Sequence, residues 1–331
     1  MRAAALTLLA VAAVGCGGDA GPPLAPAGAR IELMLSDLRA LDPAREGTYS
    51  TWVVDRAGAM HAAGTIFPDA GGRAEVVLPV SDAVAFILSV EPPDDRDPAI
   101  SGQRLLGGTF RGGRAELSAL GSVTAGDLPL RVRPGQFTMF TPSDNHLSGY
   151  PSNEYAGVWL FNPAPRQSEQ NDHWVRLTQL AEGWVYEGWA VRDIGTLGAV
   201  WLSYGKFRPD GAGVVNSRDD TGWGPFSGVL DFATAGEEEY PGDDWISNPL
   251  GYPVPGNLAL PVNLQEKDAG GAARWTHVIT IESARDRGEP IGSERPFLLQ
   301  PYRDAFGDGR PGTAQSITFR GALPGGVATI R

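Results

Sequence analysis

Cysteine and histidine are scarce in this chain, which has one cysteine and four histidines in 331 residues. A single cysteine excludes a disulfide within the chain, so folding must rest on the hydrophobic core. The histidines are not spaced as metal ligands, and we interpret them as scattered surface residues: His61, His146, His173 and His277. The sequence also lacks a His-Glu-x-x-His motif, a Gly-x-Ser-x-Gly elbow, a Walker loop and a dinucleotide fingerprint. We therefore predict no catalytic residue, no metal, no cofactor and no enzymatic activity.

Positive charge is scarce as well, because 27 Lys and Arg against 39 Asp and Glu give a formal net charge of −12. An acidic surface argues against a nucleic-acid partner and against electrostatic docking on anionic lipid. Long apolar runs with helical periodicity are missing, whereas Gly (44) and Pro (27) are abundant. This combination favours an all-β fold of short strands joined by turns.

The N-terminus has the features of an export signal. Met1 and Arg2 precede an uncharged, mostly apolar run over residues 3–14, which is too short to cross a bilayer, since that needs about 20 residues. The run leads into Ala13-Val-Gly-Cys16, which resembles the lipobox of bacterial lipoproteins. The resemblance implies cleavage after the signal peptide and a lipid on Cys16. The alternative is an ordinary secretory signal followed by a coincidental cysteine.

Residues 16–29 contain many Gly and Pro and few large apolar side chains, so we expect a lipidated flexible tether after a signal peptide at 1–15. Acyl chains on Cys16 then provide the membrane contact. Residue 17 is Gly rather than Asp, so the inner-membrane retention cue of enteric lipoproteins is absent. These features predict a cell-envelope protein that faces the periplasm, with the outer membrane favoured.

Two parts of the chain repeat one pattern. The matching segments occur in the same order in both parts: Tyr49-Ser-Thr-Trp52 with Tyr186-Glu-Gly-Trp189, and Phe86-Ile-Leu-Ser-Val-Glu91 with His277-Val-Ile-Thr-Ile-Glu282. We predict two copies of one module, at 30–118 and 155–302, with bridging strands at 119–154 and a C-terminal tail with a possible strand at 303–331.

Alternation of apolar residues predicts strands within these modules. Val84, Phe86, Leu88 and Val90 share one face of such a strand, and the segment 31–35 is also interpreted as a strand. Modules of this size built from short strands favour tandem immunoglobulin-like β-sandwiches. In such sandwiches Trp52 and Trp189 are candidates for central core aromatics.

Several motifs follow one another in the first module: Leu38-Arg-Ala-Leu41, Tyr49-Ser-Thr-Trp52, Ala63-Gly-Thr-Ile-Phe67, Leu88-Ser-Val-Glu-Pro92 and Leu105-Leu106. They resemble the C-terminal extracytoplasmic domain of anti-sigma-K factors. The second half, with phrases such as Gly157-Val-Trp159 and Pro241-Gly-Asp-Asp-Trp245, resembles envelope lipoproteins that carry this domain twice. The resemblance implies a fold and a location more than an activity. Anti-sigma-K factors also have a cytoplasmic sigma-binding segment and a spanning helix. We find no counterpart of either here and expect no direct contact with a cytoplasmic sigma factor.

Tryptophan is unusually frequent, with eight of the nine residues from Trp159 onward. Trp159, Trp189 and Trp201 lie in strand-like runs and are expected in the core. Trp223 and Trp245 lie in loop-like stretches, and we select them, with Asp243 and Asp244, as a candidate ligand or partner surface. The clusters of acidic residues are interpreted as solvated loop acids: Asp94–Asp97, Asp219-Asp220, Glu237–Glu239 and Asp243-Asp244.

Two functions are consistent with these features. The preferred one is a non-enzymatic envelope lipoprotein, anchored through Cys16, whose modules bind or sense a protein or another component of the envelope. The alternative is a carbohydrate-binding or glycan-active protein that uses the loop tryptophans and acids, because aromatic rings stack on sugars and paired carboxylates can hydrolyse glycosidic bonds.

Overall fold

The computed structural model describes residues 28–125, 130, 137–141, 154–160, 177–209, 215–219, 241–248, 251–284, 295–320 and 322–331. Regular structure in these residues is almost entirely antiparallel strand, which confirms the all-β prediction. Helical structure in these residues is confined to short segments, such as α1 (Leu120–Val123) and the single turn η2 (Pro255–Asn257). Neither has the length and apolar character needed to cross a membrane.

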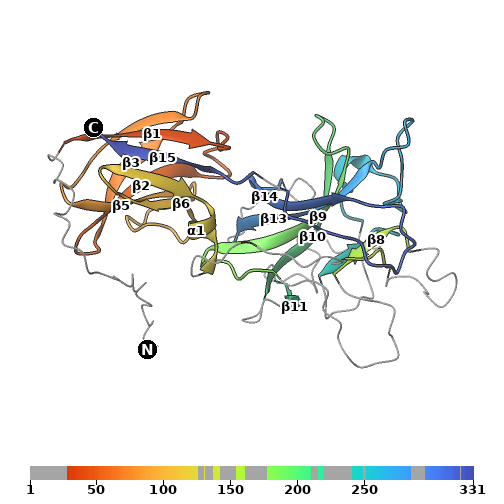
Figure 1. Ribbon diagram of the computed structural model, residues 1–331. Helices are drawn as coiled ribbons and strands as arrows, with labels where there is room; N and C mark the ends of the chain where they lie inside the picture. Colours follow the sequence, from red (N-terminus) through yellow and green to blue (C-terminus); the bar gives the residue numbers. More distant parts are fainter. Residues whose placement is uncertain are drawn as a thin grey trace.

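The first sheet has eight strands in the order β3-β2-β5-β6-β7-β15-β1-β4. Seven come from the N-terminal part of the chain: β1 (Arg30–Ser36), β2 (Thr48–Asp55), β3 (Met60–Ile66), β4 (Arg73–Val77), β5 (Ala83–Glu91), β6 (Arg104–Thr109) and β7 (Arg114–Ser118). The eighth, β15 (Gly325–Ile330), comes from the C-terminus and pairs with β1 on one side and β7 on the other. Figure 1 shows this blue strand beside the orange β1. The segment expected as a tail therefore completes the first sheet.

The second sheet has five strands in the order β11-β10-β9-β13-β14. Its strands are β9 (Trp184–Arg192), β10 (Val200–Pro209), β11 (Val215–Asp219), β13 (Trp275–Ser283) and β14 (Leu299–Ala305). A small third sheet pairs β8 (Gly157–Trp159) with β12 (Gly242–Asp244). Because β15 returns to the first sheet, the whole second sheet lies in sequence between β7 and β15 (Figure 1).

Alternating apolar residues place the strands against the core as the sequence predicted. Ile31, Leu33 and Leu35 of β1 are buried, while the residues between them are exposed. In β5, Phe86 and Leu88 are fully buried. Successive side chains of a strand point to opposite faces, so one face of each strand covers the core.

The two sheets repeat one four-strand unit, β3-β2-β5-β6 in the first and β10-β9-β13-β14 in the second. Within it Tyr49 lies opposite Val90, and Tyr186 lies opposite Ile281. Each tyrosine hydroxyl donates to a backbone carbonyl of the segment before its strand, at 2.8 Å in the first unit and 2.7 Å in the second. The residues that the sequence pairs thus occupy equivalent places.

A shared irregularity reinforces this equivalence. The β2–β3 ladder shifts register next to Gly64, and the β9–β10 ladder shifts next to Gly205. Both glycines have positive φ, 126° and 106°, a backbone region that favours glycine. A bulge at the same place in both ladders explains why Gly recurs there in the sequence.

Trp52 and Trp189 are buried, but on the face of their strands opposite to the tyrosines. Tyr49 and Tyr186 belong to the main hydrophobic core, whereas Trp52 is outside it and Trp189 belongs to a small separate cluster. Residues three positions apart on a strand point to opposite faces, so the tyrosine and the tryptophan cannot both enter the same core. Both tryptophans are buried, as expected, but neither packs in the main core with the tyrosines.

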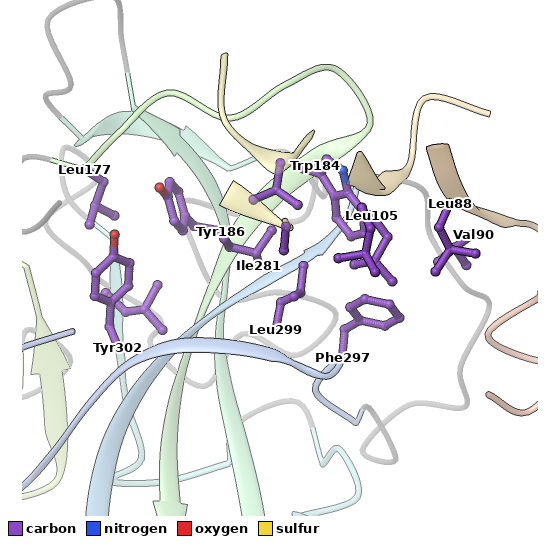
Figure 2. Packing of buried hydrophobic residues seen from close by; sticks show 14 of the residues in the cluster. Leu88, Val90, Leu105, Leu177, Trp184, Tyr186, Ile281, Phe297, Leu299 and Tyr302 are labelled. Carbon is purple, nitrogen blue, oxygen red and sulfur yellow. The ribbon is translucent and has the colours of Figure 1, made fainter. Parts of the chain in front are cut away.

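The two units share one continuous core at their junction. Figure 2 shows Leu88, Val90 and Leu105 of the first unit beside Trp184 and Phe297 of the second, and all five side chains belong to one buried cluster. The Trp184 indole donates across the junction to a β6 backbone carbonyl at 3.1 Å. Burial of large apolar side chains between the units predicts that they are not free to move independently.

Candidate functional site

The outer face of the first unit carries a groove of about 590 Å³. Trp52 and its neighbours on β2 and β3 form its floor. Its rim is formed by Glu91, at the end of β5, and by the segment 92–99 that follows. Trp52 remains 8% exposed there. Four proline rings and several hydroxyl side chains also line the groove: Pro43, Pro92, Pro93 and Pro98, with Thr48, Ser50, Thr51 and Thr65.

A chain of hydrogen bonds fixes the polar side of this groove. The Trp52 indole donates to the Ser89 hydroxyl at 2.8 Å, and that hydroxyl donates to the Glu91 carboxylate. The same carboxylate accepts the Ser101 backbone N–H at 3.1 Å. Glu91 is therefore held in one place at the base of the rim, because its carboxylate accepts hydrogen bonds from residues before and after the rim segment.

The charge of the groove is negative. Three carboxylates line it, those of Glu91, Asp95 and Asp97, and no Lys or Arg is among its described lining residues. Asp95 and Asp97 each use one carboxylate oxygen to accept a nearby backbone N–H, at 2.8 and 2.9 Å, which holds both side chains on the rim. A groove with this lining attracts cations and repels anions.

In the second unit the equivalent tryptophan is covered. Trp189 keeps the same hydrogen bond, from its indole to the Thr280 hydroxyl at 2.9 Å, but it is fully buried. Trp201 packs edge-on against it, with ring centroids 5.7 Å apart. Trp201 lies opposite Val191, as Met60 lies opposite Val54, so the aromatic cover of the second unit is replaced in the first by an exposed methionine. Among the residues that the structure describes, Trp52 lines a groove and its equivalent, Trp189, is covered.

The described residues of the ligand surface predicted from the sequence do not lie at the surface. Asp243, Asp244 and Trp245 are all fully buried. Asp243 pairs with Val158 in the small sheet, and the Trp245 backbone N–H donates to the Ala156 carbonyl at 2.8 Å. The predictions that Trp245 is an exposed loop residue and that Asp243-Asp244 are solvated acids are wrong, because contacts with β8 bury a segment whose own composition is typical of a loop.

The acidic segment at 94–97 behaves as expected, since Asp94 and Asp97 are exposed. Cys16 and Trp223 lie outside the described residues, as do His146, His173, Asp220 and Glu237–Glu239. Among the side chains that the structure does describe, no group of three or more His, Cys, Asp or Glu is placed to hold a metal ion.

His277 is not a surface residue, which corrects the sequence interpretation. It is fully buried in β13, and burial lowers its pKa to about 3, so it is neutral at physiological pH. Its Nε2 atom lies 2.8 Å from the Tyr204 hydroxyl. Tyr204 reaches it across Gly188, where an added Cβ would lie 1.7 Å from the tyrosine ring. The repeat contained the signal for this, because it pairs His277 with Phe86, a core residue.

The surroundings of His277 give it a structural role. The rings of Phe137 and Phe306 pack against the imidazole, with ring centroids 4.2 and 6.0 Å from its own, so solvent does not reach it. Burial also raises the pKa of the Tyr204 hydroxyl well above its ordinary value. A neutral histidine and a neutral tyrosine in an enclosed apolar site are poorly placed to exchange protons with a substrate, and we assign the pair to the core.

Comparison with known proteins adds no relative. No protein family matches this chain, and neither the curated proteins nor the solved structures include one with significant similarity to it.

Proposed function

We propose that this protein is a non-enzymatic, lipid-anchored binding protein of the bacterial cell envelope, and that the groove around Trp52 holds a cationic segment of an envelope partner. The observation that carries the proposal is the difference between the two copies. One unit closes its tryptophan face with Trp201, while the other leaves an open groove rimmed by three carboxylates. Charge complementarity favours a ligand that carries lysine or arginine. The proline rings add an apolar lining that suits apolar side chains of an extended ligand.

The finer description of the fold is part of this proposal. We regard the two units as immunoglobulin-like sandwiches derived from one duplicated module, related to the extracytoplasmic domain of anti-sigma-K factors. The equivalent ladders and the equivalent tyrosine and tryptophan hydrogen bonds support the duplication. The proposed role is extracytoplasmic binding, without direct contact with a cytoplasmic sigma factor.

Lipid attachment is tested at Cys16. A Cys16→Ser variant should lose incorporation of labelled palmitate and move from the membrane fraction to the soluble fraction, because no thiol remains to carry the acyl groups. Conversion of Gly17 to Ala is the matched control and should leave both properties unchanged. Equal membrane recovery of the Cys16→Ser variant would contradict the lipid anchor.

Groove binding is tested with rim carboxylates that are not part of the core. A variant carrying Asp95→Asn and Asp97→Asn should bind a short peptide of lysine and proline at least about tenfold more weakly than the parent, in a titration at fixed ionic strength. The control variant carries Glu75→Gln and Glu116→Gln, which remove the same charge from β4 and β7 outside the groove.

The results separate the ligand classes. An equal loss in both variants would mean a general charge effect and would contradict a groove site. A glycan array run on the same proteins covers the carbohydrate alternative. Glycan binding that is lost in the Asp95/Asp97 variant, with no peptide binding in the parent, would replace the cationic ligand with a sugar.

A further inference from the structure

A second cleft, of about 510 Å³, lies between the two units. The first unit contributes Asp37, Leu38 and Arg39 from the connection after β1, and the second contributes residues of β14 and of the segment before β15. The second group includes Arg303 and Arg320. Three arginines and one aspartate therefore meet in one cleft of a chain whose net charge is −12.

The chain itself holds two of these arginines in place. Arg39 forms a bidentate ion pair with Glu46. The Tyr49 hydroxyl fixes the backbone at this point, because it donates to the Arg39 carbonyl at 2.8 Å. Arg320 pairs with Asp304 at 2.7 Å, and its Nε donates to the Thr318 hydroxyl at 2.9 Å. These contacts fix the positions of two guanidinium groups that line the cleft, one from each unit.

Donor capacity remains after these contacts are made. A guanidinium has five N–H donors, and the described contacts of Arg39 and Arg320 use three and two of them. Arg303 is exposed on β14, where its backbone N–H donates to the Thr318 carbonyl at 3.2 Å. Its side chain forms no hydrogen bond or ion pair with another described residue. The cleft thus combines fixed guanidinium groups with one that has its full donor set available.

We infer that this cleft binds a phosphate-bearing ligand between the two units. Arginine forks match the geometry of phosphate oxygens, and several forks around one cavity suit a doubly charged group. Leu38, Leu298 and Ala322 supply apolar lining for a small body attached to the phosphate. A cavity of this volume is within the usual size range for small-molecule sites, about 300–1,000 Å³. This inference is independent of the groove at Trp52, which is lined by carboxylates and has no Lys or Arg among its described lining residues.

The test uses the full chain with Cys16→Ser, so that the lipid anchor does not contribute to binding. Isothermal titration with glycerol 3-phosphate, at constant ionic strength set with chloride, should give saturable binding. Conversion of Arg303 to Gln should weaken that binding about tenfold or more, because one charge-assisted pair is lost. Conversion of Arg303 to Lys should give an intermediate loss, since the charge stays and the fork is removed. Arg310→Gln, on an exposed loop outside the cleft, should bind as the parent does.

A second arm distinguishes a soluble ligand from a lipid head group. The same proteins are sedimented with phosphatidylcholine vesicles that contain or lack phosphatidic acid. Sedimentation that depends on phosphatidic acid and on Arg303 would identify a lipid head group, and binding of glycerol 3-phosphate alone would identify a soluble ester. No saturable binding in either arm, or equal binding by the Arg303→Gln variant, would overturn the inference. Loss of binding in Asp95/Asp97 variants would also count against it, because those residues lie in the other groove.

Discussion

Removal of residues 325–331 is expected to unfold the protein. These residues contain β15, which lies inside the first sheet and pairs with β1 along one edge and β7 along the other. Each backbone hydrogen bond contributes about 0.5–1.5 kcal/mol, and two complete ladders are lost together with the buried Ala328. That sum approaches the total stability of an ordinary domain, about 5–15 kcal/mol. The truncated chain should show no cooperative thermal transition by circular dichroism and should be digested rapidly under limited proteolysis.

Two point variants in β15 separate this effect from a general intolerance of change at the C-terminus. Ala328 is fully buried, whereas the neighbouring Val327 points to the other face and is partly exposed. Ala328→Asp should destabilise the protein by about 3–5 kcal/mol, since it buries an unpaired charge. Val327→Asp should cost much less. An unchanged melting midpoint after truncation would mean that the C-terminal segment is a dispensable tail and that the sheet order is incorrect.

The strands could be predicted from the sequence because they depend on local alternation. Ile31, Leu33 and Leu35 alternate with exposed residues, and a period of two is visible in any short window. The position of β15 could not be predicted in this way. Gly325-Gly-Val-Ala-Thr-Ile330 is compatible with many partners, and its place between β1 and β7 depends on contacts almost 300 residues away, such as Leu33 with Ala328.

The candidate site shows the same division between local and long-range information. The repeat identified Trp52 and Trp189 as equivalent, and their hydrogen bonds are equivalent. Alternation alone, applied to Tyr49 and Trp52, would have placed the tryptophan on the outer face. The groove itself depends on the segment 91–99 and on the absence of an aromatic cover at Met60, neither of which a local pattern contains. The neighbours of Trp245 in the sequence predict a loop, although the residue is fully buried and pairs with Ala156, far away in the chain.

The buried His277 makes the stability of the protein depend on pH at a position where the first unit has an apolar residue. Phe86 occupies the equivalent position in the first unit and cannot titrate. In the folded protein burial lowers the pKa of His277 to about 3, against about 6.5 for a solvated histidine. Between these two values the unfolded chain binds one more proton than the folded chain. Stability from this group is therefore complete above pH 6.5 and is lost as the pH falls toward 3.

The expected loss is large: at about 1.4 kcal/mol per pH unit, roughly 3–5 kcal/mol disappears over the whole range. Carboxylates that are held by arginines, such as Asp193 with its lowered pKa, lose their contribution only below about pH 4. Urea unfolding between pH 6.5 and 4.5 therefore avoids their titration, and the difference between the parent and a variant without the imidazole isolates the histidine. A His277→Phe, Tyr204→Phe variant should have a smaller slope in that window than the parent, without leaving an unpaired hydroxyl. Tyr204→Phe alone should keep the slope, because burial of His277, and not its hydrogen bond, lowers the pKa. Equal slopes in the parent and the double variant would show that the imidazole is not buried in solution.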